Sequence, residues 1–288
     1  MPELPEVETI RRGLSATVLG RRVERIGVLW QASLRGRIDQ GLAGLHLIGI
    51  RRRGKLLIGD LSDGGHLLVH LMMTGQLVVV DDGQILFAGG HPTRSMLGPM
   101  PNPTTRVILW LAGGRELYFN DQRKFGRLWL VDDAGLAADP FVARLGPEPL
   151  GSAFTLSAFR TQLRRHARAP VKAVLLDQSV VAGIGNIYAD ESLHLARVHP
   201  RRPAGGLSGA ESRRLHAAVR VTLARAVESG GTSFAEYVNA ARGGHGFLAQ
   251  ARAFRREGLP CVVCGTTMAR ISVAGRGTTL CPRCQRSP

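Results

Sequence analysis

All four cysteines of this chain lie near its C-terminus, in two Cys-x-x-Cys pairs. Cys261 pairs with Cys264 and Cys281 with Cys284, and sixteen residues separate the two pairs. Each tight turn supplies two adjacent thiolates, so two turns complete the four-sulfur tetrahedron that Zn2+ prefers. Because no coordination position is left for a substrate, the sequence predicts one structural zinc ion per chain.

Disulfide bonds are the alternative use of the same cysteines. The N-terminus carries Glu3, Glu6 and Glu8 where a secretory leader would be basic and then apolar. No stretch approaches the roughly 18 consecutive apolar residues of a membrane span. These features predict a bacterial-type cytoplasmic or nucleoid-associated protein without a membrane partner, in a reducing compartment where disulfides are rare.

The segment between the two cysteine pairs, 266–280, is predicted to form a hairpin that the zinc ion holds as a rigid finger. Its tip places Arg276 between Gly275 and Gly277. Glycine lets the backbone approach a ligand closely, and a guanidinium is well suited to phosphate oxygens. Arg276 is therefore a candidate phosphate-binding residue.

The net charge of +16 is unevenly distributed along the chain. Residues 1–150 hold 18 Lys and Arg against 15 Asp and Glu, a balance of +3, whereas residues 151–288 hold 20 against 7, a balance of +13. A basic half is typical of proteins that bind a polyanion such as nucleic acid. A highly charged, solvated surface is the alternative that composition leaves open.

Hydrophobic spacing changes along the chain. Residues 5–18 carry apolar side chains at helical spacing and predict a helix. Short β-rich runs between Val23 and Val131 predict an antiparallel sandwich or barrel, with a long loop over 88–103. The remainder predicts helices over 156–166, 170–178, 187–196, 208–229 and 233–240. The fold class is therefore α+β with two domains.

The turn Gly183-Ile184-Gly185-Asn186 precedes one of these predicted helices. Asn186 stands where an N-cap belongs, and a helix N-terminus attracts a phosphate through its unpaired N–H groups and its dipole. Lys172 lies upstream at another predicted helix start and is a second candidate phosphate contact. An ordinary cap and an ordinary surface lysine remain the alternatives.

Lysine is rare in this chain. Of 38 basic residues only Lys55, Lys124 and Lys172 are lysines. Coding bias toward arginine explains the rarity, but a lysine can lose its proton where an arginine cannot. Each of the three lysines is therefore a residue to examine for a role of its own.

The chain opens with Met1-Pro2-Glu3. Removal of Met1 would free Pro2 as a secondary amine, and an α-amino group has a pKa near ~8. Such an amine can attack a sugar carbon and form an iminium, with Glu3 beside it as a general acid or base. An ordinary helix start with an acidic first turn is the alternative, and the local sequence alone favours it.

The combination of motifs along the whole chain favours Pro2 as a nucleophile over an ordinary helix start. In one order the chain carries PELPEVETIRRGL, Arg53-Gly54-Lys55, His70–Gly75, Asp121–Gly126, Leu145–Leu150, GIGNIYADESL and the two cysteine pairs. Together these closely resemble the formamidopyrimidine-DNA glycosylase family, and the resemblance spans nearly the whole chain. The family's members are bifunctional repair enzymes that remove oxidised purines such as 8-oxoguanine.

The resemblance implies a mechanism in base-excision repair of double-stranded DNA. Pro2 would attack C1′ of the damaged nucleotide through a Schiff base, and Glu3 would exchange protons with the sugar and base. Lys55 would donate a proton during β-elimination at the abasic site. Arg276 would bind the flanking phosphate and support δ-elimination.

The resemblance also implies DNA contacts and a domain order. Asn186 and Lys172 would bind phosphates, and the trio Met73, Arg123 and Phe125 would fill the space that the extruded base leaves. The implied domains are a catalytic β-sandwich flanked by helices at 1–135, a linker at 136–151, a helix-two-turn-helix DNA-binding domain at 152–250, and a zinc finger at 251–288. The protein is expected to be a monomer.

Some segments depart from the family pattern. Pro103-Thr104-Thr105-Arg106 replaces a histidine-containing segment, so that DNA contact is expected either to be absent or to be supplied by His91 or Arg106. The segment 241–247 is short and glycine-rich, and Phe254-Arg255-Arg256 stands where Tyr-Gly-Arg is usual. These departures affect the expected lesion preference more than the expected lyase chemistry.

Two other functions remain open. One is an endonuclease VIII-like glycosylase for oxidised pyrimidines, whose typical opening Pro-Glu-Gly-Pro-Glu differs from the PELPEVE of this chain. The other is a non-catalytic zinc-containing DNA-binding protein, which would need neither a free Pro2 amine nor Lys55. The presence of Pro2, Glu3 and Lys55 together argues against it.

Overall fold

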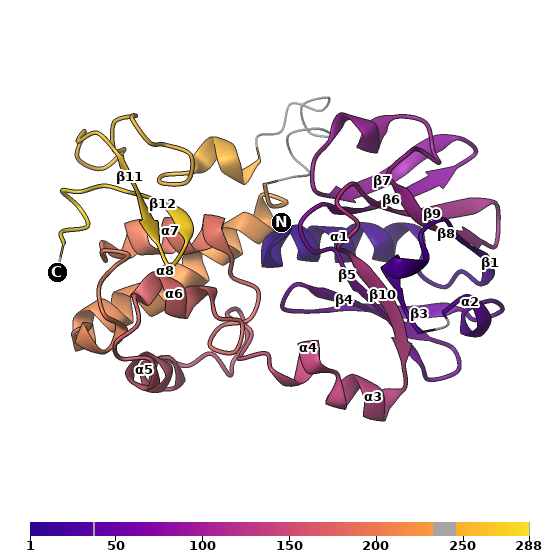
Figure 1. Cartoon of the computed structure of the whole chain (residues 1–288), viewed down its shortest axis with the longest axis horizontal. Helices are drawn as coiled ribbons and strands as arrows, with labels where there is room; N and C mark the ends of the chain where they lie inside the picture. Colours follow the sequence, from indigo (N-terminus) through magenta and orange to yellow (C-terminus); the bar gives the residue numbers. More distant parts are fainter. Residues whose placement is uncertain (37, 233–245, 288) are drawn as a thin grey trace. The chain divides into compact units, whose positions relative to one another are not determined.

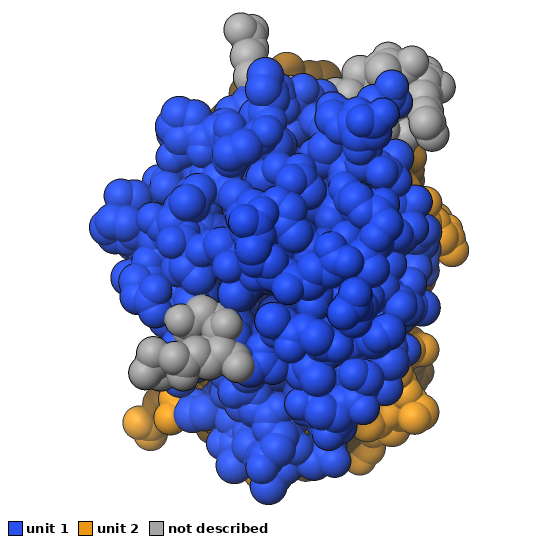
Figure 2. Space-filling model, turned by 90° about the vertical axis from the view of Figure 1, so that its right-hand side faces the viewer, with its two compact units in different colours: residues 1–143, 230–246 blue, residues 144–229, 247–288 orange. Residues whose placement is uncertain are grey.

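The computed structural model describes residues 1–36, 38–232 and 246–287. The chain forms two compact units (Figure 1). The N-terminal unit comprises residues 1–143 and 230–246, and the helical unit comprises residues 144–229 and 247–288. Figure 2 colours the surface by unit and presents a face made mainly by the N-terminal unit. This division groups the cysteine-bearing hairpin with the helices, and the finer sequence-based domain boundaries stay predictions.

The N-terminal unit is a β-sandwich, as predicted. Its first five-stranded sheet has the order β1 (Val23–Val28), β8 (Thr105–Leu111), β9 (Arg115–Asp121), β6 (Gly75–Asp81) and β7 (Gln84–Gly90). Its second has the order β2 (Leu34–Arg35), β10 (Arg127–Val131), β5 (His66–His70), β4 (Leu56–Leu61) and β3 (Leu47–Arg53). Alternate side chains of both sheets, such as Leu57, Val69, Val79 and Leu109, share one apolar core.

Helix α1 (Leu4–Thr17) closes part of this sandwich and contacts strands of both sheets. Pro5 suits the first turn of a helix, and Val7, Ile10 and Leu14 bury one face at helical spacing. The predicted helix is therefore confirmed. It begins one residue earlier than expected, and the residues just before it, Pro2 and Glu3, are buried.

Short elements fill the segments that were expected to be irregular. The predicted loop 88–103 contains the end of β7 and a 3-10 turn, η2 (Arg94–Leu97). The predicted linker, 136–151, overlaps the end of the short helix α3 (Asp133–Ala138) and contains α4 (Pro140–Ala143). The N-terminal unit also holds η1 (Gln31–Ser33) and α2 (Ile38–Gly41). Asp132 caps α3 by accepting the Gly135 N–H at 2.7 Å.

The helical unit is built from α5 (Leu156–Arg165), α6 (Val171–Leu176), α7 (Asn186–Ala196) and α8 (Gly209–Glu228), with η3 (Ala204–Gly206) and η4 (Phe247–Gln250). Ser208 and Glu211 form a capping box at the start of α8. Leu215, Val219 and Leu223 then repeat every four residues and are buried. The predicted helix 233–240 lies outside the described residues.

A hairpin completes the helical unit. Strands β11 (Ala269–Val273) and β12 (Arg276–Leu280) pair antiparallel, and β12 packs on α7. The hairpin predicted between the cysteine pairs is thus present. Among the described helices of both units, none has the length and apolar character required to cross a bilayer.

Candidate functional site

The start of the chain lies in a buried, charged environment within the N-terminal unit. Pro2 is buried and Glu3 is 3% exposed. Burial lowers the pKa of the Met1 amine, and Lys55 and Arg123 lower it further against the opposing effect of Glu3 and Glu6. Three residues predicted from separate motifs therefore act electrostatically on the N-terminus: Glu3, Lys55 and Arg123. An amine held at this place is more readily deprotonated than one in water.

Glu6 organises the backbone around the N-terminus. Its carboxylate accepts the Glu3 N–H at 2.8 Å, and it accepts the Thr232 N–H and hydroxyl at 2.8 and 2.9 Å. Gly231 allows this approach, because a Cβ there would lie 2.8 Å from a Glu6 carboxylate oxygen. This role of Glu6 could not be predicted, because nothing in the sequence links residue 6 to residue 232.

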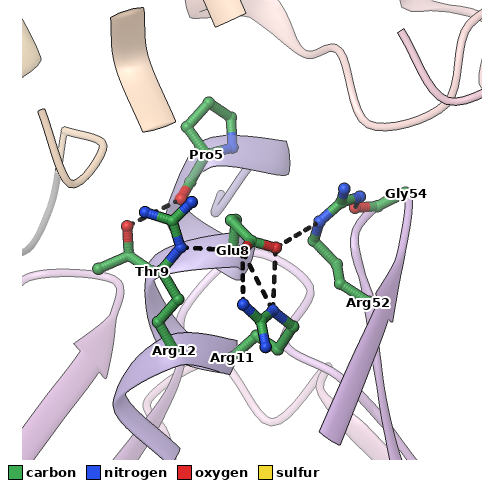
Figure 3. A network of polar contacts seen from close by, with 7 residues as sticks. All are labelled: Pro5, Glu8, Thr9, Arg11, Arg12, Arg52 and Gly54. Carbon is green, nitrogen blue, oxygen red and sulfur yellow. Dashed lines mark hydrogen bonds and ion pairs between the residues drawn. The ribbon is translucent and has the colours of Figure 1, made fainter. Parts of the chain in front are cut away.

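Lys55 follows a glycine turn between β3 and β4 and is 8% exposed. Gly54 has φ +56°, a conformation that favours glycine. Arg52 donates to the Gly54 carbonyl at 3.0 Å and to Glu8 of α1 at 3.3 Å (Figure 3). This arrangement ties the turn that bears Lys55 to the helix that bears the N-terminus.

Glu8 is the centre of the network in Figure 3 and accepts from three arginines, Arg11, Arg12 and Arg52. Burial acts to raise its pKa, but the arginines prevail and hold the pKa of Glu8 below its usual value. The carboxylate therefore stays charged and keeps its three partners at neutral pH.

His70 was not among the predicted site residues, although it lies within one of the motifs. Burial, assisted by the charge of Lys55, lowers the pKa of His70 to about 4. Its Nδ1 accepts the Met72 N–H at 3.0 Å, so the neutral ring carries its proton on Nε2. The sequence could not predict this neutral N–H donor near Lys55, because the pairing of β4 with β5 brings His70 close to Lys55.

The predicted trio Met73, Arg123 and Phe125 lies on two joined turns. Met73 is on the turn before β6, and the segment Asp121–Gly126, here called the wedge turn, carries the other two. Both Met73 and Phe125 are exposed, at 37% and 46%. The Arg123 guanidinium lies 4.8 Å from the centre of the Phe125 ring. The structure therefore presents all three side chains outward and rules out a core role for Met73 and Phe125.

Asp121 fixes the wedge turn from inside the unit. It is fully buried and accepts the Thr74 hydroxyl and the N–H groups of Arg123 and Gly126, the latter at 2.6 Å. Thr74 in turn accepts the Arg123 N–H at 3.0 Å. Because Thr74 follows Met73 directly, this set of bonds holds the two turns together.

Arg106 lies inside the N-terminal unit, where it is 9% exposed. Its guanidinium donates to the carbonyls of Asp121, Pro103 and Thr105 at 2.9, 3.1 and 3.3 Å. The Asp121 bond places Arg106 behind the wedge turn. Its expected contact with DNA stays a prediction.

Lys172 is fully buried in the helical unit and forms an ion pair with Asp190 of α7 at 2.6 Å. It also donates to the Gly277 carbonyl and the Thr278 hydroxyl, and Asp190 accepts the Thr279 N–H at 3.1 Å. Burial raises the pKa of Asp190 to about 6 despite this pair. In this structure Lys172 binds the hairpin strand β12, and its expected phosphate contact stays a prediction.

The prediction that Asn186 is an N-cap was wrong by one residue: Gly185 is the N-cap of α7 and Asn186 is its first helical residue. Gly185 has no side chain with which to cap the helix. Gln178 stabilises the preceding turns by donating to the Ile184 carbonyl and accepting the Gly183 N–H. The Asn186 amide instead donates to the Gly277 carbonyl at 3.0 Å. Asn186 and Lys172 thus meet at the same carbonyl beside Arg276.

Arg276 is exposed at the first position of β12. The turn before it contains Ala274 and Gly275, both with positive φ, which suits a two-residue hairpin. Arg276 therefore projects from a short turn whose strand is anchored by Lys172, Asp190 and Asn186.

The four cysteines form a compact cluster at the base of the hairpin. Their sulfurs all lie within 4.8 Å of one another, and all four are free thiols. Backbone N–H groups of Val263 and Cys284 point at the sulfurs of Cys261 and Cys281 at 3.4 Å. Four sulfurs with N–H donors around them fit Zn2+. The cluster is therefore a structural zinc site, and its cysteines are not paired as disulfides.

Comparison with known proteins agrees with this geometry. Family models match three segments: the formamidopyrimidine-DNA glycosylase N-terminal domain over residues 1–128, its H2TH domain over 145–237, and the zinc finger found in FPG and IleRS over 258–286. A formamidopyrimidine-DNA glycosylase of Cereibacter sphaeroides is 42% identical over 99% of this chain and 100% of its own length. One from Thermus thermophilus is 43% identical, with 99% and 98% covered.

Solved structures give the same result. The crystal structure of the MutM (Fpg) protein from Thermus thermophilus matches with a TM-score of 0.84 at 42% identity, covering all of both chains. A complex of Lactococcus lactis Fpg with DNA containing an abasic site matches with a TM-score of 0.86 at 31% identity, covering 99% of this chain and 100% of the other.

A β-sandwich with a charged N-terminus, an H2TH domain and a four-cysteine finger define a DNA glycosylase of base-excision repair. The chain belongs to the formamidopyrimidine-DNA glycosylase family.

Proposed function

We propose that this enzyme excises oxidised purines, 8-oxoguanine and formamidopyrimidines, from double-stranded DNA and then cleaves the abasic site by β,δ-elimination. The observation that carries the proposal is the start of the chain, where Pro2 and Glu3 are buried and burial lowers the pKa of the amine that Met1 carries. Lactococcus lactis Fpg has been solved with DNA containing an abasic site and with DNA containing Fapy-dG. We expect this chain to act in the cytoplasm, at the nucleoid.

The proposed nucleophile is Pro2 once Met1 has been removed. Its nitrogen forms a bond to C1′ while the bond from C1′ to the base breaks, and the base leaves with that electron pair and a proton. The attached nitrogen then loses its proton, its lone pair forms the C1′=N iminium, and the C1′–O4′ bond breaks as O4′ takes up a proton. Loss of a C2′ proton from this iminium breaks the C3′–O bond, and loss of a C4′ proton in a second elimination breaks the C5′–O bond, so each phosphate leaves with its electron pair. Glu3 exchanges the protons at sugar and base, and Lys55 supplies a proton during β-elimination.

The DNA contacts are divided between the two units. We propose that Arg276 binds the phosphate beside the lesion, with Asn186 at a neighbouring phosphate. Lys172 is buried against Asp190, so its proposed phosphate contact requires that ion pair to open when DNA binds. Met73, Arg123 and Phe125 fill the space of the extruded base, which their exposure on joined turns supports. In this scheme Arg106 makes a further contact with the DNA. Zinc, when bound, holds the hairpin that bears Arg276 and takes no part in the chemistry.

Borohydride trapping on abasic duplex DNA tests the nucleophile. Protein lacking Met1 should yield a covalent adduct, whereas a matched form that retains Met1 should bind the same duplex without forming one. An adduct that survives chemical blocking of the N-terminal amine would show that another residue is the nucleophile.

Excision from a panel of defined lesion duplexes tests the substrate. Release of 8-oxoguanine and formamidopyrimidines in preference to oxidised pyrimidines supports the proposal. The reverse order would identify the endonuclease VIII-like activity, and binding without excision would identify a non-catalytic DNA-binding protein.

A further inference from the structure

Trp30 makes a contact with the wedge turn that the proposed function does not use. It follows β1, and its side chain is 38% exposed. The Lys124 ammonium lies 3.8 Å from the centre of the Trp30 ring. Such a geometry is a close cation–π contact, in which the negative face of the indole attracts the cation.

Lys124 occupies the strained position of the wedge turn. Its φ is +60°, in the left-handed region that disfavours residues other than glycine. Asp121 holds the N–H groups of Arg123 and Gly126, on either side of Lys124. Lys124 itself is held through its carbonyl, which accepts from Arg127 at 3.0 Å, and through its side chain on Trp30.

Trp30 is a firm support because its own backbone is fixed. The N–H groups of Leu29 and Trp30 both donate to the Arg106 carbonyl, at 2.8 and 3.2 Å. The Arg106 side chain donates to the Asp121 carbonyl at 2.9 Å. Arg106 therefore connects the backbone of Trp30 to the base of the wedge turn, and the indole contacts the turn at Lys124.

We propose that Trp30 is a positioning residue for base extrusion. Its indole face holds the Lys124 ammonium, which stabilises the left-handed residue between Arg123 and Phe125 and so orients both side chains for insertion into the duplex. The inference rests on the proposed role of Arg123 and Phe125. It also gives Lys124, one of only three lysines in the chain, a contact of its own.

A double-mutant cycle under single-turnover conditions tests this inference. The probe is a duplex with 8-oxoguanine and 2-aminopurine as a neighbouring base, so that fluorescence reports extrusion. We expect Trp30→Leu and Lys124→Met each to slow extrusion about three- to fivefold, the double variant to be no slower, and Trp30→Phe to retain most of the rate. Borohydride trapping on single-stranded abasic DNA, which needs no wedge, should be unchanged in Trp30→Leu.

Phe125→Ala separates the two ways in which this test can fail. If Phe125→Ala slows extrusion but Trp30→Leu does not, or if the Trp30 and Lys124 effects add, the positioning role of Trp30 is wrong. If Trp30→Leu slows trapping on single-stranded DNA equally, Trp30 acts outside extrusion and the inference is again wrong. If Phe125→Ala itself has no effect on extrusion, the wedge function fails. Thermal melting of each variant confirms that the N-terminal unit stays folded.

Discussion

The two units differ in how they place charge. The N-terminal unit comes from the nearly neutral part of the sequence, and it buries the residues proposed for chemistry: Pro2, Glu3 and Lys55. The helical unit comes from the strongly basic part and exposes Arg276 on a hairpin. Burial shifts protonation equilibria, whereas exposed charge attracts a polyanion over a distance. Chemistry and attraction are thus assigned to different units.

The units also differ in what stabilises them. The sandwich is closed by a large apolar core that α1 completes. The hairpin of the helical unit has only a small cluster of its own, formed by Ala253, Met268 and the cysteines. The helices of that unit have a large apolar core as well, so it is the hairpin, where metal ligands take the place of apolar packing, that should depend on zinc. The sandwich should not.

Removal of zinc should have the largest effect and should affect one unit. We expect Cys281→Ser to lose the zinc ion and to abolish specific DNA binding, because structural zinc sites contribute on the order of 10 kcal/mol to folding. All three tryptophans, Trp30, Trp110 and Trp129, lie in the N-terminal unit. Metal analysis and DNA binding should change while the tryptophan emission spectrum stays the same. A red-shifted spectrum would show that the sandwich also needs the metal.

Glu3→Gln should separate chemistry from binding within the N-terminal unit. Loss of a general acid or base costs about 10²- to 10⁴-fold in rate, whereas the affinity for lesion DNA should stay within about twofold because no phosphate contact is lost. Single-turnover excision and a binding titration measure the two quantities. Glu24→Gln, at an exposed site on β1, is the matched control and should behave like the parent enzyme.

Arg276→Ala should show the opposite pattern in the helical unit. We expect DNA affinity to fall about tenfold and the slope of log affinity against log salt to decrease by about 0.9, as for one lost phosphate contact. Titrations at several salt concentrations measure this slope. Arg213→Ala, an exposed arginine on α8, serves as the control. An unchanged slope would mean that Arg276 does not bind a phosphate.

The smallest expected effect concerns pH and the sandwich alone. The folded pKa of His70, about 4, lies below its ordinary value of 6.5. The folded state keeps the ring neutral while the unfolded state takes up a proton, so the stability from His70 is full above about pH 6.5 and is lost as the pH falls toward 4. Between pH 7 and about pH 5.5 the loss should be about 1 kcal/mol.

Urea unfolding followed by tryptophan fluorescence measures this loss in the N-terminal unit. His70→Gln should remove that part of the pH dependence, and the exposed His46→Gln should leave it in place. A slope that is the same in His70→Gln as in the parent would assign the pH dependence to other groups.

Patterns with local causes could be predicted from the sequence. Helix α1, most of the strands, the hairpin and the zinc ligands follow from spacing that is visible within a few residues. Strands β4, β7 and β9 are harder to predict, because Gly59, Gly89 and the polar residues at the ends of β9 obscure the alternation. Their neighbours in the sheets, far away in sequence, decide their structure.

The residues of the candidate site also fall into those that local motifs identify and those whose surroundings depend on distant parts of the chain. Pro2, Glu3, Lys55 and Arg276 could be selected from motifs, and their elements follow from sequence. The burial of Lys172 and Arg106 could not be predicted, because each depends on partners, Asp190 and Asp121, that no local pattern identifies. The shifted His70 and the contact of Trp30 with Lys124 also arise only from strand pairing.

The bonds of Glu6 have a consequence for how the enzyme matures. Glu6 joins the backbone of Glu3 to Thr232, and the peptide that follows Met1 becomes buried with Pro2. This closure requires residue 232, which the ribosome adds when most of the chain has been made. Met1 itself stays 42% exposed, but the peptide bond that an aminopeptidase must cleave ends at the buried Pro2. We therefore expect Met1 to be removed fastest during synthesis, before residue 232 is available to Glu6, and more slowly once the chain has folded.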